Sequence, residues 1–363
     1  MSCSPLPLVC LDATLAGGEN TGDSTYWTGL IGGLFQCEPR VRIALLTNRQ
    51  PPKELSDPPE WAHWEVLKGK GRYFNQVGMP FFARRRRACA FHTQYTLSPL
   101  APGGITTVHD VSFLIGPEWF RPKDRFLLSR TVPGSVRRAR KVITVSETSK
   151  NDIVRLLGVP PEKVVVTYNG VDARFRPVGE GEVSACRAKY GIEGPYCLTV
   201  GTLWPRKNMT LAVEAMKLLP ESVPHRLVIV GKAGWEAVAD HPRVLRTGYV
   251  PDEDMPALYC GADLYLCPSR YEGFGLPVVE AMACGTPVVS SSGGALPEVV
   301  GDAGVVIPSW EPEEWARVIQ ELLGNWSMLA QMREAGLERS KRFTWKNAAE
   351  RTLRVYEEVC GVD

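Results

Sequence analysis

Two glutamates, Glu272 and Glu280, bracket a glycine-rich stretch, with Gly-Phe-Gly-Leu-Pro at residues 273–277 between them. Glycine lets a ligand approach the backbone closely, and the free N–H groups at the start of a following helix favour an anion. Carboxylates accept hydrogen bonds from hydroxyl groups, so the two glutamates could contact different parts of one extended ligand. The alternative is a tight strand-to-helix turn with two solvated acids.

A pair of adjacent cations, Arg206 and Lys207, follows the apolar run at residues 196–200. An arginine fork can bind phosphate oxygens while a lysine acts as a point charge. Together they could neutralise a diphosphate and stabilise it as it departs. Without such a setting, a basic pair is more often solvated surface.

A histidine and an aspartate, His109 and Asp110, directly follow the apolar run at residues 105–108. A histidine at the carboxyl end of a strand suits a position that faces a ligand, and a core or supporting histidine is the alternative. We expect Asp110 to organise the loop rather than to perform chemistry. His92 and Tyr95 follow the preceding strand, where a place on the acceptor side and a structural role are both consistent with the sequence.

The runs that must position these residues are short and apolar, and they alternate with helical patterns along the chain. Such runs indicate parallel sheets with helices on both faces, and two series of them predict two doubly wound α/β domains. Open parallel sheets bind ligands at the carboxyl ends of their strands, where the loops described above are expected. The expected strands are residues 7–11, 42–47, 88–91, 105–108, 141–145 and 164–167, and then 196–200, 226–230, 244–247, 264–267, 287–290 and 305–307.

The break between the two series falls near residues 175–181, where turn-forming residues cluster. The 363 residues include 42 Lys and Arg against 40 Asp and Glu, but the charges are unevenly spread. Residues 1–180 hold 24 basic and 16 acidic residues, and the remainder holds 18 and 24, so the net charge is +8 before the break and −6 after it. The 44% hydrophobic share excludes bulk disorder.

The segment around Glu272 and Glu280 closely resembles the donor-site signature of retaining glycosyltransferase family 4, within glycosyl transferases group 1. The resemblance continues through residues 285–289 and 293–299 and covers nearly the whole chain. It implies the GT-B arrangement, in which two Rossmann-like domains face each other across a cleft. The implied parts are an N-terminal acceptor domain over residues 1–176, a nucleotide-sugar donor domain over 177–343, and a terminal helix over 344–363 that packs back on the first domain.

The implied reaction is the retaining, metal-independent transfer of a hexosyl group, of mannosyl or glucosyl type, from a nucleotide-diphosphate sugar. The acceptor would be a hydroxyl group of a polysaccharide, a glycolipid or a lipid-linked carbohydrate, and neither a cofactor nor a metal is expected. The alternatives are a sugar-nucleotide epimerase on the same fold and a non-catalytic protein that binds a nucleotide sugar.

The resemblance also implies roles for individual residues. Arg206 and Lys207 would bind the diphosphate and Glu280 the ribose. Glu272 would contact the transferred sugar, which His109 would approach from the opposite domain. The remaining implied donor-site positions are the backbone at Gly273, Phe274, Gly275 and Leu276, the base-contacting segment at Val250, and the glycine loop after the first strand at Gly18 and Gly22.

Two segments need separate treatment. In the loop after the first strand, Ser24 stands where the family commonly has a second glycine, so this loop could determine acceptor specificity instead. Asp252 and Asp254 spell the Asp-x-Asp metal motif of the other, single-domain glycosyltransferase class. They lie at the start of an expected helix over residues 254–260, where acidic residues are favourable, so we expect capping and no metal.

The sequence also bears on location. No apolar run is long enough to span a bilayer, and the first residues lack the basic region of a signal peptide. The ten cysteines show no metal-binding spacing, and a disulfide scaffold is not expected at this length, which favours the cytoplasm.

A compact basic cluster suggests peripheral contact with the inner face of a membrane. Basic residues beside aromatic ones suit an anionic lipid surface. A solvated helix face is the alternative, and a nucleic-acid partner is not expected because no nucleic-acid-binding fold accompanies the cluster. The cluster consists of Phe81 and Phe82 followed by Arg84, Arg85, Arg86 and Arg87.

Overall fold

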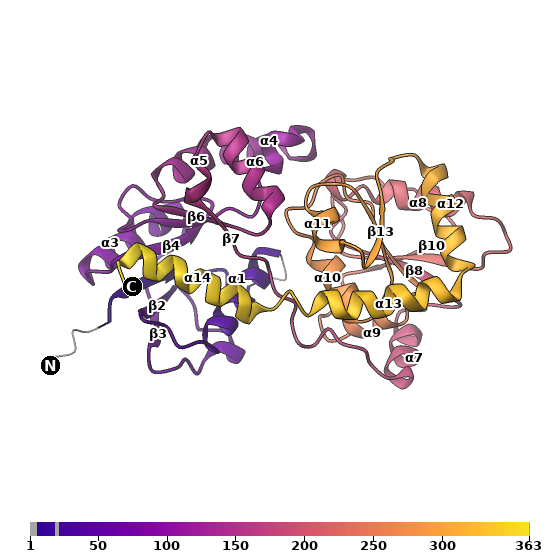
Figure 1. Ribbon diagram of the computed structural model, residues 1–363, viewed down its shortest axis with the longest axis horizontal. Coiled ribbons are helices and arrows are strands. Elements are labelled where there is room, and N and C mark those ends of the chain that lie inside the picture. Colours follow the sequence, from indigo (N-terminus) through magenta and orange to yellow (C-terminus); the bar gives the residue numbers. More distant parts are fainter. Residues whose placement is uncertain (1–5, 19–21, 363) are drawn as a thin grey trace. The chain divides into compact units, whose positions relative to one another are not determined.

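The structure, a computed structural model, describes residues 6–18 and 22–362 of the chain. The chain forms two compact units: unit 1 comprises Met1–Gly170 and Thr344–Asp363, and unit 2 comprises Val171–Phe343 (Figure 1). Unit 2 therefore begins earlier than the boundary expected after residue 176. Val171 N donates a backbone hydrogen bond of 3.0 Å to Phe343 O, so the first and last residues of unit 2 are tied together.

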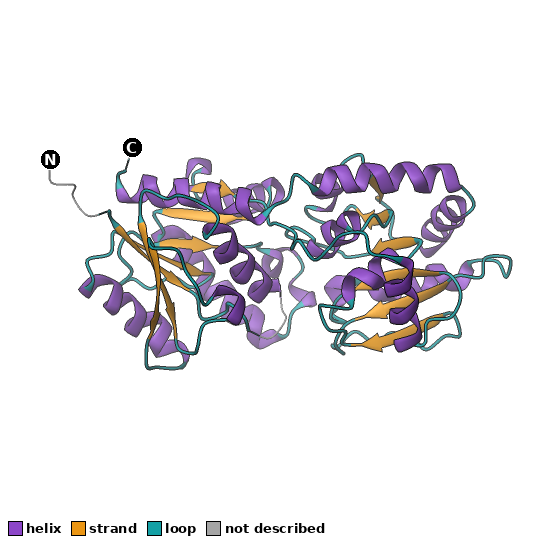
Figure 2. Ribbon diagram, turned by 90° about the horizontal axis from the view of Figure 1, so that it is seen from below, coloured by secondary structure: helices purple, strands orange, loops and turns teal. Residues whose placement is uncertain are grey.

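Unit 1 is built on a parallel sheet whose described strands number seven, in the order β3-β2-β1-β4-β5-β6-β7 (Figure 2). Six of them lie where strands were expected. The exception is β3, which lies at the edge of the sheet and alternates polar His63 and Glu65 with apolar residues, so it lacks the apolar run of a buried strand. The strands are β1 (Leu8–Asp12), β2 (Arg42–Thr47), β3 (Ala62–Val66), β4 (Ala90–Gln94), β5 (Ile105–Thr107), β6 (Lys141–Thr144) and β7 (Val164–Val166).

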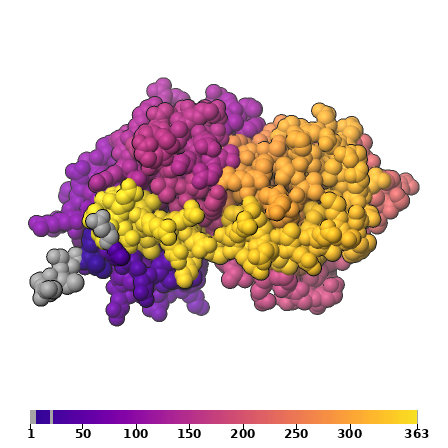
Figure 3. All heavy atoms as spheres, in the orientation of Figure 1, coloured from indigo at the N-terminus to yellow at the C-terminus, as the bar shows by residue number. Residues whose placement is uncertain are grey.

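Helices cover both faces of this sheet, because right-handed crossovers run in opposite directions from β1 and β4. The first helix, α1 (Gly22–Leu34), shares its face with the C-terminal helix, α14 (Trp345–Cys360). In the space-filling view the yellow atoms of α14 lie on the indigo and purple atoms of unit 1 (Figure 3). The remaining helices of unit 1 are α2 (Gly71–Tyr73), α3 (Met79–Arg85), α4 (Ser112–Ile115), α5 (Pro122–Arg138) and α6 (Glu147–Leu157), with short turns η1 (Lys53–Leu55), η2 (Phe74–Gly78), η3 (Pro117–Trp119) and η4 (Pro161–Lys163).

Glycines explain how closely α14 approaches α1. A Cβ atom on Gly29 would lie 2.1 Å from the Trp345 ring, and one on Gly33 would lie 2.2 Å from the Trp345 carbonyl oxygen. Any larger residue would push the helices apart. The start of α14 therefore packs directly on α1 at these two glycines.

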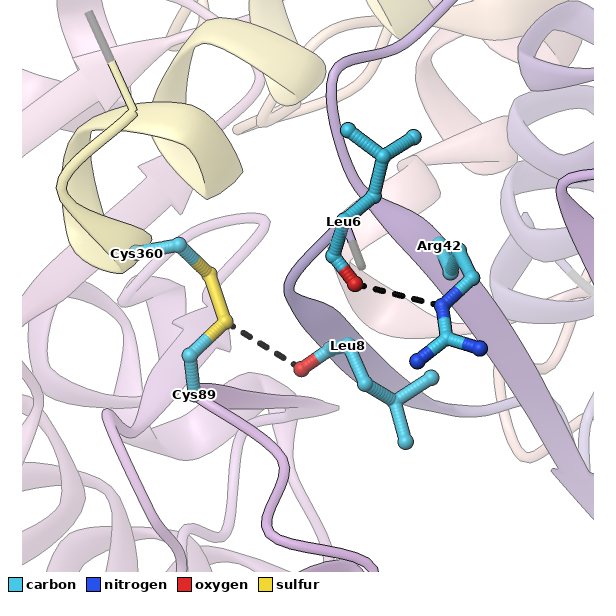
Figure 4. The surroundings of a disulfide bond; sticks show 5 residues. All are labelled: Leu6, Leu8, Arg42, Cys89 and Cys360. Atoms are coloured by element: carbon cyan, nitrogen blue, oxygen red, sulfur yellow. Dashed lines mark hydrogen bonds between the residues drawn. A yellow bond between two sulfur atoms is a disulfide. The ribbon is translucent and has the colours of Figure 1, made fainter. Parts of the chain in front are cut away.

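The other end of α14 is joined covalently to the start of β4. Cys360 and Cys89 form a disulfide with their Cα atoms 5.3 Å apart, and the Cys89 sulfur lies 3.1 Å from the Leu8 carbonyl oxygen (Figure 4). The sequence analysis, which expected no disulfide scaffold, did not foresee this single bond. The two cysteines are 271 residues apart in the sequence, so spacing carries no sign of their pairing. The other described cysteines, free thiols, are Cys10, Cys37, Cys186, Cys197, Cys260, Cys267 and Cys284.

Unit 2 repeats the plan, and its described residues form a parallel sheet in the order β10-β9-β8-β11-β12-β13. All six strands were expected from the sequence: most are buried apolar runs, and β10, at the sheet edge, is a more exposed strand that includes Arg246 and Thr247. The strands are β8 (Tyr196–Val200), β9 (Arg226–Val230), β10 (Val244–Gly248), β11 (Leu264–Cys267), β12 (Val288–Ser291) and β13 (Gly304–Ile307). The helices are α7 (Glu180–Lys189), α8 (Met209–Leu218), α9 (Met255–Cys260), α10 (Leu276–Ala283), α11 (Leu296–Val300), α12 (Pro312–Leu323) and α13 (Trp326–Ser340), with the turn η5 (Pro205–Lys207).

Each sheet has one place where the direction of strand order reverses: between β1 and β4 in unit 1, and between β8 and β11 in unit 2. Loops that leave neighbouring strands in opposite directions open a space at the carboxyl edge, and open α/β sheets bind their ligands there. In unit 2 the loops concerned are residues 201–208 and 268–275, which contain the cations and the glutamate singled out from the sequence.

Candidate active site

Arg206, Lys207 and Glu272 are in direct contact at the switch point of unit 2. Arg206 Nη1 donates to Glu272 Oε2 over 2.9 Å, and Lys207 Nζ donates to Oε1 over 2.7 Å. The Ser269 hydroxyl donates to the same Oε1 over 2.6 Å. The side chains of both cations are only 15% exposed and that of Glu272 is 8% exposed. The loops therefore build a buried cluster of two cations and one carboxylate, which keeps a net positive charge.

The charge of Glu272 depends on these contacts. Burial alone would raise the pKa of its carboxyl, but the positive charges of Arg206 and Lys207, with hydrogen bonds from Lys207 and Ser269, lower this pKa to about 2. Glu272 is therefore ionised at neutral pH. Its two oxygens fix the direction of both cations, a role that the sequence analysis did not foresee.

The backbone of Glu272 is held by a glycine pair from the loop after β12. Ala295 N donates to Glu272 O over 2.9 Å, and Glu272 N donates to Gly293 O over 3.4 Å. A Cβ atom on Gly294 would lie 2.3 Å from Glu272 O, and the φ of Gly294 is +63°. Only glycine allows this approach, which explains why the motif around Glu272 extends to residues 293–294.

Glu280 lies in α10 and has a different environment. The Tyr259 hydroxyl of α9 donates to Glu280 Oε2 over 2.8 Å. Burial raises the pKa of Glu280 to about 7, and the charges of Asp252 and Asp172 add to this rise, against the Tyr259 hydrogen bond and the charge of Lys207. The two glutamates of the motif are therefore shifted in opposite directions, so that only Glu280 titrates near neutral pH.

The residues between the glutamates form the turn into α10. Gly275 directly precedes Leu276, the first residue of the helix. The φ of Gly275 is +99°, which glycine adopts without strain. Gly273 and Phe274 are buried, and the Phe274 ring lies edge-to-face with Phe343 at 5.3 Å. Val250, after β10, is buried as well, so its contribution to a base-contacting segment would come from its backbone.

Asp254 stands at the N-cap position of α9, as expected, but its side chain makes no capping hydrogen bond. Asp254 precedes the helix, but its carboxylate accepts hydrogen bonds from Lys189 Nζ over 2.6 Å and from the Tyr190 hydroxyl over 2.5 Å. Asp252 pairs with Arg174 at 3.5 Å. Partners from α7 and from the start of unit 2 thus replace the helix N–H groups. Within the described residues no group of three or more His, Cys, Asp and Glu side chains is arranged to hold a metal ion.

In unit 1, His109 follows β5 and lies between two tyrosines. Its ring is edge-to-face with Tyr26 at 4.6 Å and with Tyr95 at 5.7 Å. Its Nε2 atom is buried and makes no hydrogen bond with the described residues, and Asp23 Oδ1 lies 3.6 Å away. Burial lowers the pKa of His109, against the charges of Asp23 and Asp110, and so favours the neutral imidazole.

Asp110 organises the His109 loop, as expected. Its Oδ1 atom accepts hydrogen bonds from the Ser112 backbone N over 2.8 Å and from the Ser112 hydroxyl over 2.5 Å. These contacts shape the turn into α4 and leave the chemistry of the site to other groups.

His92 is a core residue rather than a residue of the acceptor side. It is fully buried, with Nδ1 2.7 Å from the Tyr356 hydroxyl and Nε2 2.8 Å from Thr107 Oγ1. Burial and the neighbouring His109 lower the pKa of His92 to about 3, so it stays neutral. Tyr95, by contrast, directly follows β4. Its φ of +55° is unusual for a tyrosine, and its ring lies beside that of His109.

The loop after β1 is described only in part, because residues 19–21 lie outside the described ranges. Gly18 N donates to Leu15 O over 3.2 Å, and Gly22 is the first residue of α1. These glycines and His109 belong to unit 1, whereas the other candidate residues belong to unit 2. The structure thus gathers the candidates into two groups.

Sequence reasoning missed a buried acid, Asp12, at the end of β1. Asp12 accepts hydrogen bonds from the backbone and hydroxyl of Thr14 and from the hydroxyl of Thr93. Burial raises the pKa of its carboxyl, against these hydrogen bonds. The available signal was an acid directly after an apolar run, at the carboxyl edge where sites form.

The four arginines at residues 84–87 lie at and after the end of α3 and are exposed. Arg86 pairs with Glu65 at 2.6 Å, and Arg84 Nε donates to Leu100 O over 2.5 Å. The nearby Phe81 is 61% exposed. No helix within the described ranges combines the length and the apolar character that crossing a bilayer requires.

Comparison with known proteins agrees with this architecture. Residues 25–175 match Glycosyltransferase Family 4, and residues 194–325 match Glycosyl transferases group 1. O-antigen chain mannosyltransferase B of Escherichia coli is 38% identical over 268 residues, which cover 70% of this chain and 70% of that protein.

Solved structures share the fold. Sucrose-phosphate synthase from Thermosynechococcus elongatus matches with a TM-score of 0.74 and 20% identity over 97% of this chain and 98% of that chain. HepE of Anabaena, in complex with UDP and glucose, matches with a TM-score of 0.71 and 19% identity over 96% and 98%. From its sequence relatives and its two parallel-sheet units, the chain belongs to glycosyltransferase family 4 and is a hexosyltransferase with the GT-B fold.

Proposed function

We propose that the protein is a retaining glycosyltransferase that moves a hexosyl group, of mannosyl or glucosyl type, from a nucleotide-diphosphate sugar to a hydroxyl acceptor. The observation that carries this proposal is the buried cluster of Arg206 and Lys207 on Glu272 at the switch point of unit 2. Two likenesses support it: one relative is named an O-antigen chain mannosyltransferase, and HepE was solved with UDP and glucose. The acceptor class is accordingly a polysaccharide, a glycolipid or a lipid-linked carbohydrate.

In this proposal Arg206 and Lys207 bind the diphosphate of the donor. The bond between the anomeric carbon and the phosphate oxygen breaks, and its electron pair passes to the phosphate. The acceptor oxygen attacks the same face of that carbon, and its proton passes to the departing diphosphate. Two preorganised cations stabilise the charge that develops on the leaving group, so the proposed reaction needs neither a metal nor another cofactor.

Glu280 is proposed to bind the ribose hydroxyl groups. Hydrogen bonds donated to a carboxylate favour its ionised form, and the pKa of Glu280 is about 7 before such bonds are added. Donor binding at neutral pH should therefore release part of a proton. The backbone at residues 273–276 and at Val250 would complete the donor site.

The residues of unit 1 are proposed to serve the transferred sugar and the acceptor. A neutral His109 can accept or donate one hydrogen bond to a sugar hydroxyl, and its buried Nε2 makes none with the described residues. Gly18 and Gly22 would place backbone N–H groups toward phosphate or acceptor.

The proposal is tested by thermal shift measurements with GDP-, UDP-, ADP- and dTDP-hexoses, followed by analysis of the products. We expect one nucleotide class to raise the melting temperature, in EDTA as well as in magnesium. Lys207→Ala should abolish this rise. The matched control Lys217→Ala removes a lysine on α8 that pairs with Glu214, and it should keep the full rise.

The products separate the three functions. A glycosylated acceptor with a retained anomeric configuration supports the proposal. An inverted configuration, or activity lost in EDTA and restored by a divalent cation, contradicts it in part. An epimerised nucleotide sugar, or binding without turnover across the acceptor classes, would instead favour one of the alternatives.

We also propose peripheral contact of unit 1 with an anionic membrane through Phe81 and the arginines at 84–87. Exposed cations beside an exposed aromatic ring are suited to anionic lipid headgroups. Arg84→Ala with Arg85→Ala should reduce cosedimentation with vesicles of phosphatidylglycerol and phosphatidylcholine, whereas Arg317→Ala with Lys341→Ala on α12 and after α13 should not. Equal pelleting of wild type and of both double variants would exclude the contact.

A further inference from the structure

We propose that Tyr356 of the C-terminal helix is a positioning residue for His109. It acts through His92, Thr107 and Tyr26, and the Cys89–Cys360 disulfide holds α14 in the register that these contacts require. This inference rests on the role proposed for His109 and extends it to a part of the chain that lies far away in sequence.

A chain of buried polar contacts crosses unit 1 from α14 to β5. The Tyr356 hydroxyl lies 2.7 Å from His92 Nδ1, and His92 Nε2 lies 2.8 Å from Thr107 Oγ1. The same Thr107 oxygen lies 3.1 Å from the Tyr26 hydroxyl. All four side chains are fully buried, with exposures of 0%.

None of the titratable groups in this network changes its protonation near neutral pH. The pKa of His92 is about 3, because of burial and the nearby His109, and burial raises the pKa of Tyr26 and of Tyr356. A neutral imidazole donates one hydrogen bond and accepts one, so His92 can link two hydroxyl groups in only one pattern at a time. The contacts therefore form a fixed hydrogen-bond network and not a pH-dependent switch.

This hydrogen-bond network ends next to His109. Thr107 is two residues before His109, and the Tyr26 ring packs edge-to-face on the His109 ring at 4.6 Å and 84°. On its other side Tyr26 meets Trp345, the first residue of α14, at 6.1 Å. Both ends of α14 thus contribute to the orientation of His109, one through Tyr356 and one through Trp345.

The disulfide acts at the far end of the same helix. Tyr356 and Cys360 are four residues apart, so they lie on one face of α14, toward β4. Cys360 is bonded to Cys89, just before β4 (Figure 4). Tyr356 contacts His92 within β4. The disulfide therefore restrains a shift of α14 along its axis, which is the movement that would carry the Tyr356 hydroxyl away from His92.

A purely structural role would give the same contacts, so the test must separate positioning from stability. Tyr356→Phe removes one hydroxyl group and keeps the ring. The matched control is Tyr196→Phe in unit 2: Tyr196 is equally buried, and its hydroxyl donates to Leu258 O over 2.7 Å. Both variants lose one buried hydrogen bond, and both should lower the melting temperature.

Only Tyr356→Phe should impair transfer. We expect its kcat to fall about tenfold with the donor KM within about twofold of wild type, because the hydroxyl orients His109 without touching the donor. Thr107→Val should act in the same way, and the double variant Tyr356→Phe/Thr107→Val should be little worse than either single variant. A normal kcat in Tyr356→Phe, beside a melting temperature lowered as in Tyr196→Phe, would overturn the inference.

A second readout does not depend on turnover. The imidazole resonances of His109, followed by NMR and assigned with His109→Gln, should shift in Tyr356→Phe and stay in place in Tyr196→Phe. Unchanged resonances would refute positioning even if no acceptor were known. Absence of transfer by the wild type across all donors would instead count against the proposed function, so the two failures are distinguishable.

The disulfide is tested by its reduction, which adds two electrons and two protons from a dithiol reductant and yields two thiols. Treatment of the wild type with dithiothreitol should lower kcat and shift the His109 resonances in the direction seen for Tyr356→Phe. The double variant Cys89→Ser/Cys360→Ser should show the lowered kcat and the shifted resonances without treatment, and dithiothreitol should not change them. If the oxidised, reduced and double-serine forms share one kcat and one spectrum, the disulfide has no part in positioning.

Discussion

The two groups of site residues differ in the kind of force that orders them. In unit 2 the candidate groups are ionic: two cations and two carboxylates, with Glu272 and Glu280 shifted to opposite sides of their ordinary pKa. In unit 1 the acids Asp23 and Asp110 lie near His109, but the groups that hold one another in place are neutral hydroxyls, imidazoles and aromatic rings. The group of unit 2 lies at the switch point between β8 and β11, whereas His109 in unit 1 follows β5, the strand next to β4.

The two units carry net charges of opposite sign. Unit 1 holds 25 basic and 18 acidic residues, a net of +7, while unit 2 holds 17 and 22, a net of −5. Arg206 and Lys207 are thus a local positive site within an acidic unit. This difference is consistent with the proposed function, in which unit 2 binds the charged part of the donor and unit 1 orients uncharged hydroxyl groups.

The largest effect is expected from removing a cation of unit 2. Lys207→Ala should lower kcat/KM by about 10²–10³-fold, because it removes one of the two groups proposed to stabilise the leaving phosphate. Steady-state kinetics checks this, with Lys217→Ala as the control of equal charge change. A loss below about tenfold would show that the ionic cluster is not the phosphate site.

The next effect concerns stability. Glu272→Gln should lower the free energy of unfolding by about 3 kcal/mol, because it leaves Arg206 and Lys207 buried without their anion. Urea unfolding of this variant beside Glu334→Gln, an exposed change on α13, measures the difference. Equal stability of the two variants would mean that the cations do not depend on Glu272.

Glu280 should produce a pH dependence of the opposite sign to that of Glu272. Its pKa is about 7 in the folded protein against 4.5 for an ordinary glutamate, so between these values only the folded state keeps the proton. The stability that this proton contributes, about 3 kcal/mol, is present at low pH and is lost as the pH rises from about 4.5 to about 7.

Comparing urea unfolding at pH 5 and at pH 8 tests this sign. Glu280→Gln should remove this part of the pH dependence, whereas Glu334→Gln should leave it. For Glu272, with a pKa of about 2, the contribution is instead present above about 4.5 and is lost as the pH falls toward 2. An unchanged slope in Glu280→Gln would contradict the assignment.

The smallest effect is expected from the exposed ion pair at the end of α14. Lys141 Nζ lies 2.7 Å from Glu358 Oε1, but Glu358 is 59% exposed. Glu358→Gln should change the free energy of unfolding by less than about 0.5 kcal/mol. A larger loss in urea unfolding would show that unit 1 also depends on ionic contacts, which would weaken the comparison.

The sequence predicted most of the fold because most of its strands are apolar runs between helical segments. It failed at β3, whose polar alternation reflects its place at the sheet edge. The motif around Glu272 identified one of the loops at the switch point of unit 2. The pairing of Glu272 with Arg206 was not predictable from spacing, because 66 residues separate them and only the order of β8 and β11 brings them together.

The same reason explains the misses in unit 1. His92 looked like a residue after a strand, but it lies within β4 and is covered by Tyr356, which is 264 residues away. The Cys89–Cys360 bond has a similar origin. Contacts made by a helix that returns from the end of the chain leave no periodic pattern, so only the folded arrangement shows them.

The central claim is that the charged part of the donor is bound by unit 2 and not by the neutral group of unit 1. Calorimetric titration with the nucleoside diphosphate of the preferred donor, at two salt concentrations, tests it most directly. Lys207→Ala should weaken binding at least about tenfold and reduce its salt dependence, while His109→Gln should stay within about twofold of wild type. Equal weakening by both variants, or a loss in His109→Gln alone, would contradict the account.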